Sequence, residues 1–287
     1  MAEISAADVK RLREKTGAGM MECKNALVST GGDFNQAEKL LKEKGLAAVE
    51  KRADRATNEG KIFVKVKDNG AQGTAVLVEL ASETDFVARN PEFIALGGTI
   101  ADIALEKGYT EPNGELSSLV TDLATKIREN MGLKRLQVLK AGPGEYLTSY
   151  IHGDGNIGVV VCVEADKVET LQNEEFRSFA FSLALHIAAF NPMALDRSRI
   201  DQTFLAEQEN IFRKQMEGDE KLQGKPANVI ENILKGKVNK YLSDICLLEQ
   251  GYVKDEKFTV AQALEDCGKR LGAKLRIKDY VYFKVGA

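Results

Sequence analysis

The sequence predicts an α+β protein, and three observations lead to this fold class. Residues 1–54 show only the helical spacing of apolar side chains. After residue 55, apolar and polar residues alternate with a period of two in several short segments. The order of hairpin, helix and strand then occurs twice along the chain. We therefore expect an N-terminal helical module followed by a duplicated antiparallel α+β core.

The composition is that of an ordinary globular protein and excludes several function classes. Of the 287 residues, 44% are hydrophobic and 29% charged, and no apolar run approaches the roughly 18 residues that a membrane span needs. The net charge of −3 argues against a nucleic-acid binder held by phosphate neutralisation. Four cysteines without a CxxC pair and only two histidines argue against a disulfide framework and a structural zinc site. The N-terminus has no targeting character, so we expect a cytoplasmic protein without metal or cofactor.

Residues 1–54 are expected to form a module of three helices. Ser5 and Asp33 are candidate N-caps, because each precedes a run with helical apolar spacing. The segment Thr16-Gly17-Ala18-Gly19 separates the first two helices, since glycine supplies the backbone freedom of a tight turn. Residues 46–60, rich in Ala, Lys and Arg, read as a helical or semi-flexible linker with a solvated charged face.

Residues 55–140 form the first copy of the core unit. Alternation at 62–66 and 75–80, around the turn Asp68-Asn69-Gly70, predicts a β-hairpin. Helical spacing follows from Phe93 and again over 116–127, and a strand is expected at about 133–139.

Residues 141–200 and 248–287 form the second copy. A hairpin is expected around the turn at 153–156, and a helix and a last strand follow at 176–187 and 275–285. Asn90-x-x-Phe93 of the first copy matches Asn173-x-x-Phe176 of the second. Residues 201–247 interrupt this copy with two helical stripes, which predicts an inserted helical hairpin. Such a hairpin either packs on the core or projects and binds a partner. The partner could be a second copy of the chain, which would give a homodimer through the inserted hairpin.

Signals for catalysis are weak. The sequence has no P-loop, no GxSxG and no HExxH motif. His186 lies in an apolar helix, where a core histidine is the favoured interpretation. His152 ends a strand beside a glycine-rich turn, so we expect it to be exposed.

The loop around Phe86 is unusual, because an aromatic and an aliphatic residue stand next to acidic residues in a turn. One interpretation is a hydrophobic staple, in which Thr84 or Asp85 caps the next helix and Phe86 packs inward. The other is an aromatic side chain presented to a partner, since aromatic residues are common at interface hot spots. Composition alone does not separate the two.

Four motifs, in the same order over nearly the whole chain, resemble the translation elongation factor Ts family. The first covers residues 10–24, KRLREKTGAGMMECK, and together with the second it is highly specific. The others are Glu83-Thr84-Asp85-Phe86-Val87-Ala88, Tyr150-Ile151-His152-Gly153 and, more weakly, Glu249-Gln250-Gly251-Tyr252-Val253.

The resemblance implies a guanine-nucleotide exchange factor for elongation factor Tu that performs no bond chemistry. It also implies a ubiquitin-associated-like N-terminal module, a two-part core and a coiled-coil insertion. Thr84, Asp85, Phe86 and Val87 would displace Mg²⁺ from the partner, with Phe86 entering it. Arg13, Met20 and Met21 would contact the partner's nucleotide domain, His152 would support the Phe86 contact, and Val253 would dock beside the N-terminal module.

Two departures and two alternatives accompany this interpretation. Some family members carry a further helical segment after the last strand, whereas this sequence ends at Ala287, and Lys254 stands where an apolar residue would suit the contact of Val253.

The first alternative function is a helical and α+β adaptor without exchange activity. The second is a hydrolase or transferase that uses Asp85 with His152.

Overall fold

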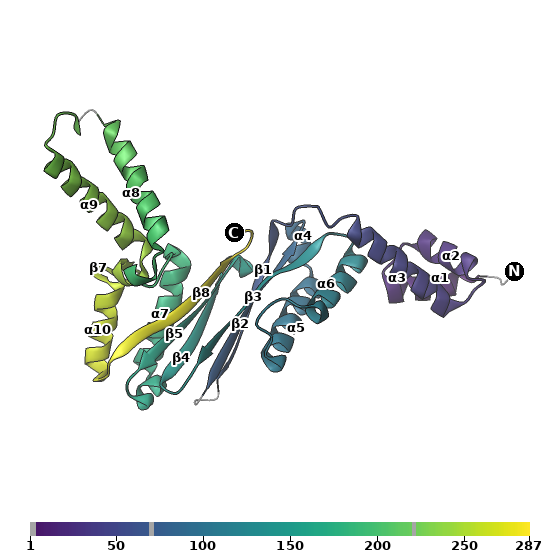
Figure 1. Cartoon of the computed structure of the whole chain (residues 1–287). Coiled ribbons are helices and arrows are strands. Elements are labelled where there is room, and N and C mark those ends of the chain that lie inside the picture. Colours follow the sequence, from purple (N-terminus) through teal and green to yellow (C-terminus); the bar gives the residue numbers. More distant parts are fainter. Residues whose placement is uncertain (1–3, 69–71, 220–221) are drawn as a thin grey trace.

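A three-helix bundle occupies the N-terminal end of the molecule in a computed structural model that describes residues 4–68, 72–219 and 222–287 (Figure 1). It contains α1 (Ala6–Thr16), α2 (Met20–Ser29) and α3 (Phe34–Glu50). The side chains of Ser5 and Asp33 cap α1 and α3 by accepting hydrogen bonds from backbone amides, as the sequence predicts. A small apolar cluster contributed by all three helices is buried between them.

Helix α3 also connects the bundle to the core, so the helical form of the linker expected over residues 46–60 is confirmed as far as Glu50. Residues 46–50 continue α3, and the chain turns only at 51–55. A Cβ at Gly45 would stand 2.2 Å from Thr125 Cγ2 of α6 (Gly114–Ile127), so glycine lets α3 pack directly on α6. Val49 packs against the apolar cluster of the first core half. Packing on α6 therefore stabilises a helix end that local sequence left undecided.

The first core half is a three-stranded antiparallel sheet covered by helices on one face. Its strands are β1 (Glu59–Asp68), β2 (Gly73–Ser82) and β3 (Met131–Ala141), in the order β1-β2-β3. The short α4 (Asp85–Ala88), α5 (Pro91–Lys107) and α6 follow β2 and pack on this sheet through one apolar cluster. Asp68 ends β1, and the other two residues of the expected turn, 69 and 70, lie outside the described residues.

The second half repeats this arrangement, which confirms the predicted duplication. Its main elements are β4 (Glu145–His152), β5 (Ile157–Ala165), α7 (Glu174–Phe190), α10 (Val260–Leu271) and β8 (Leu275–Lys284), and its sheet has the order β4-β5-β8. A short hairpin, β6 (Gly251–Tyr252) with β7 (Asp255–Thr259), precedes α10. Asn90 and Asn173 both act as N-caps, and Phe93 and Phe176 are both fully buried. The matched residues therefore have the same structural roles.

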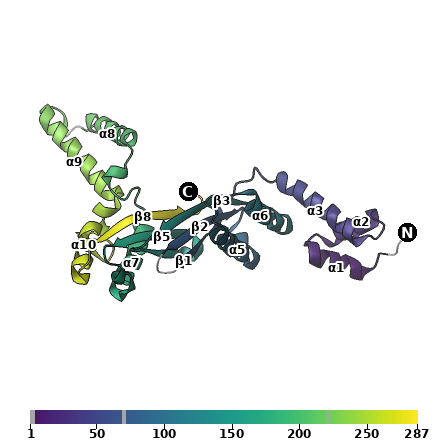
Figure 2. The ribbon, with the colours of Figure 1, turned by 60° about the horizontal axis from the view of Figure 1, so that its bottom comes forward.

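The two sheets pack face to face and form the centre of the molecule. Ile62, Leu77, Leu147, Val160 and Phe283 belong to the cluster buried between them. The helices α5 and α6 cover the outer face of one sheet, while α7 and α10 cover that of the other (Figures 1 and 2). The core thus has four layers, helix, sheet, sheet and helix. Strands β1 and β4 are in contact, and Lys61 near the start of β1 pairs with Asp154 just after β4.

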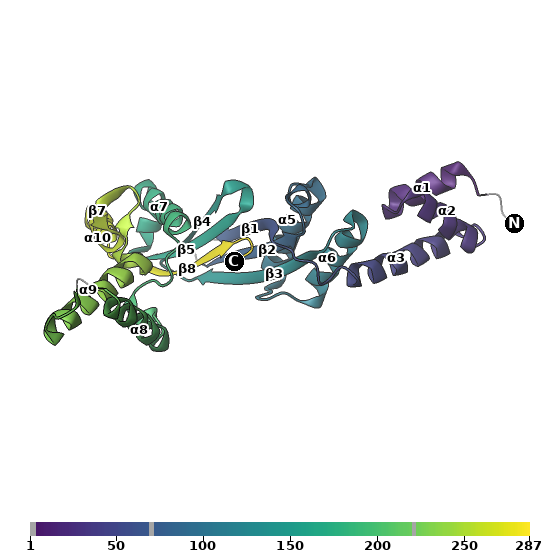
Figure 3. The ribbon, with the colours of Figure 1, turned by 90° about the horizontal axis from the view of Figure 1, so that it is seen from above.

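The inserted hairpin projects from the second half, at the end of the molecule opposite the N-terminal bundle (Figures 1 and 3). It consists of α8 (Gln202–Glu217) and α9 (Ala227–Ile245), which share an apolar cluster of their own. At its base the chain enters and leaves side by side, because the Met193 amide donates to Ile245 O at 2.8 Å and the Leu247 amide donates to Ala194 O at 2.8 Å. In the part of the chain that the structure describes, we find no helix with the length and apolar character needed to cross a membrane.

Candidate functional site

The segment of residues 84–87 forms a single capped turn between β2 and α5. The Thr84 hydroxyl accepts a hydrogen bond from the Val87 amide, and Ser82 Oγ donates to Thr84 O at 2.9 Å. Val87 is buried in the core of the first half, whereas Phe86 is 80% exposed. The staple interpretation is therefore right about the Thr84 cap and wrong about Phe86, which points away from the core. Burial of Val87 anchors the turn and leaves the aromatic ring outside.

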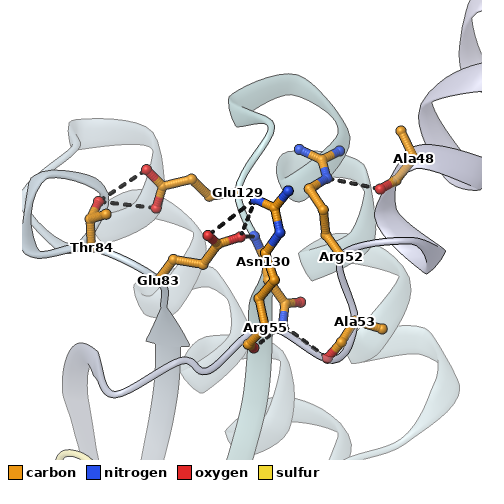
Figure 4. Close-up of polar contacts among 8 residues, drawn as sticks. All are labelled: Ala48, Arg52, Ala53, Arg55, Glu83, Thr84, Glu129 and Asn130. Atoms are coloured by element: carbon orange, nitrogen blue, oxygen red, sulfur yellow. Dashed lines mark hydrogen bonds and ion pairs between the residues drawn. The ribbon is translucent and has the colours of Figure 1, made fainter.

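Polar contacts from three parts of the chain hold this turn in place (Figure 4). Glu83 Oε1 accepts from the Asn130 amide at 2.6 Å, and Arg55 Nη1 lies 3.3 Å from Glu83 Oε2. Thr84 Oγ1 donates to both carboxylate oxygens of Glu129 at 3.0 Å. Arg55 belongs to the charged segment expected to be solvated, and its side chain is indeed exposed while it pairs with Glu83.

His152 lies at the end of β4 and is exposed, as its position in the sequence predicts. Its Nδ1 is 3.0 Å from the Tyr150 hydroxyl. The following turn is held from the other core half, because Lys61 Nζ of β1 lies 2.8 Å from Asp154 Oδ2 and also donates to the Asp154 carbonyl. The Lys61 side chain is only 8% exposed, and Asp154 has a left-handed backbone with φ of 58°.

The turn after β4 and the turn at residues 84–87 lie at the same end of the core. Both turns contact β1. At the start of this strand, Glu59 pairs with Ser82, which lies just before the turn at residues 84–87, and Lys61 pairs with Asp154 of the turn after β4. The Lys61 ammonium holds the pKa of Asp154 below its ordinary value, and the guanidinium of Arg89, directly after α4, acts in the same direction. Because both turns adjoin the start of β1, Phe86 and His152 lie at the same end of the core.

The N-terminal bundle presents a second exposed surface. Met20 and Met21 open α2 and are 42% and 64% exposed, and Arg13 on α1 is exposed as well. Glu22 caps its own helix by accepting from the Gly19 amide at 2.9 Å, and it pairs with Arg128 of the core. The Gly19 amide and the Arg128 guanidinium hold the pKa of Glu22 below its ordinary value. The two methionines are thus free for contact while their helix is tied to the core.

Val253 does not lie beside this bundle, which corrects the expected position. It follows β6 in the second half and packs against the core there, and Figure 1 places β7 at the opposite end of the molecule from α1–α3. Its amide donates to Nδ1 of the fully buried His186, whose Nε2 is 3.0 Å from Gln250 Oε1. His186 is therefore a core histidine, as expected, and Val253 shares its surroundings.

The remaining candidates among the described residues are a metal-binding cluster and a contact between Asp85 and His152. No three His, Cys, Asp or Glu side chains gather among them as a metal site would require. Asp85 pairs with Arg89 at 3.3 Å, and His152 contacts Tyr150, so the contacts found in the described chain do not join Asp85 to His152. Glu83 stands in the second sequence motif, whereas three other supporting residues were missed by sequence reasoning: Lys61, Glu129 and Asn130. Their partners lie far away along the chain, and no local pattern marks them.

Comparison with known proteins gives a consistent result. A family model described as elongation factor TS matches residues 83–287. The chain is 48% identical to elongation factor Ts of Treponema denticola over 284 residues, which covers 99% of each chain. It is 45% identical to elongation factor Ts of Treponema pallidum (strain Nichols) over 293 residues and 39% identical to that of Borrelia duttonii over 284 residues, again with 99% of each chain covered.

Proposed function

We propose that this chain, which belongs to the elongation factor Ts family of guanine-nucleotide exchange factors, releases GDP from elongation factor Tu by inserting the Phe86 side chain into it. The observation that carries this proposal is the 80% exposure of an aromatic ring on a turn whose neighbouring residues are capped and buried. An exposed ring on a flexible loop would lose entropy on binding. A ring on a fixed turn is already placed, which lowers that cost.

The mechanism requires no bond to form or break. In the partner, GDP and Mg²⁺ stabilise each other, because the ion neutralises the diphosphate charge. Phe86, held by its turn, enters beside this site and displaces the partner groups that hold Mg²⁺, while Asp85 brings a negative charge near the ion. Once the ion leaves, the diphosphate is held less tightly and GDP dissociates.

Exchange is then a matter of linked equilibria. If this chain weakens GDP binding by some factor, GDP weakens the binding of this chain by the same factor. GTP or GDP that returns to the empty partner therefore expels the exchange factor. The exchange factor leaves unchanged and can act on another partner molecule, so substoichiometric amounts of it are enough to exchange the nucleotide.

The remaining contacts hold the partner in place. We assign Arg13, Met20 and Met21 to docking on the nucleotide-binding domain, since flexible thioethers adapt well to an apolar surface. His152 supports the Phe86 contact from the neighbouring turn. The alternative of a hydrolase using Asp85 and His152 is not favoured, because each of these side chains contacts a different group. No observation favours an adaptor without exchange activity.

The test is the release of labelled GDP from elongation factor Tu with substoichiometric amounts of this chain. We expect each molecule to release many GDP molecules. We also expect the acceleration to shrink when Mg²⁺ is chelated beforehand, because the ion is then already gone. A release rate that does not change on addition of the folded chain would refute the proposal.

A further inference from the structure

The turn between α6 and β3 contacts both surfaces assigned to the partner. It consists of three consecutive residues, Arg128, Glu129 and Asn130. Arg128 pairs with Glu22, the residue after Met21. Both carboxylate oxygens of Glu129 accept a bifurcated hydrogen bond from the hydroxyl of Thr84, two residues before Phe86. One short turn is therefore linked directly to the N-terminal bundle and to the segment of residues 84–87.

Asn130 joins this turn to the connection between the bundle and the core (Figure 4). Its Nδ2 donates to Ala53 O at 3.1 Å and to Arg55 O at 2.8 Å, and its backbone amide donates to Glu83. Asn130 thus joins its own turn to two other segments of the chain, the turn at 51–55 and Glu83. A side chain that donates to two carbonyls of one turn fixes that turn more firmly than a single hydrogen bond would.

The backbone of Arg128 makes this three-way contact geometrically feasible. Arg128 is the C-cap of α6, with φ of 69°, and its amide donates to Ala124 O at 2.9 Å. A left-handed residue at a helix end reverses the chain, so the side chains that follow it point to new neighbours. Most residues avoid this conformation, and here the contacts of the turn hold an arginine in it.

We propose that residues 128–130 are a positioning element that sets the distance and angle between the docking surface of α2 and the side chain of Phe86. This inference rests on the proposed function and assigns residues that touch neither the nucleotide nor, in our assignment, the partner. Docking through Met20 and Met21 would bring Phe86 to the Mg²⁺ site only if the two surfaces keep a fixed relation.

The three residues contribute unequally. The Arg128–Glu22 ion pair is half-exposed on both sides, and exposed pairs are weakly stabilising. The bundle is also held by the packing of Gly45 on Thr125. Glu129 and Asn130 are partly buried and contact the turn of Phe86 or its neighbour Glu83, so we expect the larger effect from these two.

The test compares the variant Glu129→Ala/Asn130→Ala with the wild-type chain in GDP release at increasing concentrations of elongation factor Tu. We expect the maximal exchange rate to fall about tenfold or more, because a small misplacement of a positioned group is costly. The concentration of half-maximal rate should change little, since the methionines still dock. In a Phe86→Ala background the same two changes should have little further effect, because they act through Phe86.

Three controls keep this inference separate from a loss of folding and from the proposed function. Lys65→Ala removes an exposed ion pair with Asp102 on the same core half and should leave exchange unchanged. The single variant Glu129→Gln keeps an accepting oxygen for Thr84 and should retain most of the wild-type exchange rate. Thermal unfolding checks that each variant is folded. A wild-type exchange rate in the Glu129→Ala/Asn130→Ala variant would overturn the inference. An equal loss of rate when the same two changes are made in the Phe86→Ala background would also overturn it. In either case the proposed function stands as long as the wild-type chain accelerates GDP release.

Discussion

Replacing Phe86 by alanine separates a contact with the partner from a contribution to folding. The ring is 80% exposed, so its removal should cost about 0.5 kcal/mol of unfolding free energy or less, as surface substitutions do. For comparison, Phe93 is fully buried on the neighbouring helix, and truncating such a residue costs about 3–5 kcal/mol. The melting temperature of Phe86→Ala should therefore shift by no more than about 2 °C.

The expected effect on exchange follows from the area that the ring leaves free. A Phe side chain buries about 200 Å² when it is fully covered, so this ring leaves roughly 160 Å² for a partner. At about 25 cal/mol per Å² this area corresponds to an upper value of roughly 4 kcal/mol. Alanine keeps the Cβ, and hot-spot truncations cost about 2 kcal/mol or more. We expect GDP release to slow by about 30-fold or more, since each 1.36 kcal/mol is a factor of about ten.

The assay is the release of fluorescent GDP from elongation factor Tu in a stopped-flow instrument, together with thermal unfolding of the same preparations. Phe258→Ala is the matched control, because Phe258 is 49% exposed and lies on β7 in the other core half. It should leave the exchange rate unchanged. A Phe86→Ala variant with full exchange activity would refute the reasoning, and so would a loss of stability of the size expected for a buried ring.

Three other predictions concern the docking surface, the neighbouring turn and pH. Arg13→Ala with Met21→Ala should weaken the complex about tenfold, mostly through faster dissociation in a surface-binding assay, with unchanged melting temperature. His152→Ala should slow GDP release by less than Phe86→Ala does, and a double-mutant cycle should show coupling between the two. Burial lowers the pKa of His186, because the folded protein holds the neutral imidazole more favourably than the charged one. The resulting contribution to the free energy of unfolding is fully present above the ordinary pKa of about 6.5, and it is lost as pH falls through the lowered pKa of the folded state. The melting temperature should therefore fall between pH 7 and pH 5, and less so in a His186→Asn variant.

Local signals in the sequence located the elements and their ends well. Ser5 and Asp33 cap helices as expected, because each capping contact reaches only three residues along the chain. The repeated pattern of buried residues in α5 and α7 made the duplication visible for the same reason. The exposure of His152 followed from its place at a strand end beside a glycine turn.

Contacts between distant segments could not be predicted in this way. Lys61 looks like one of several lysines in an alternating strand, yet it is buried against Asp154 of the other core half. Gly45 looks like a weak point in a helix, yet it is the place where α3 meets α6. Either Phe86 or its neighbour Val87 could have been buried in the first core half. Val87 is the one that packs in the apolar cluster, so the Phe86 ring points outward. Each outcome is decided by packing between segments that the sequence does not bring together.

The base of the α8–α9 hairpin has a consequence for how this region tolerates change. Residues 194 and 246 are joined by a parallel bridge, so the core itself closes the loop that carries the two helices. The entropy of closing a loop grows only slowly with its length. The hairpin's apolar cluster runs along α8 and α9 and includes Ala194 and Ile200 at its base, while the rings of Phe212 and Tyr241 add a contact between the two helices. Chain length can therefore be gained or lost at the tip with little penalty for the sandwich of sheets, and this site is a natural place to graft a foreign domain.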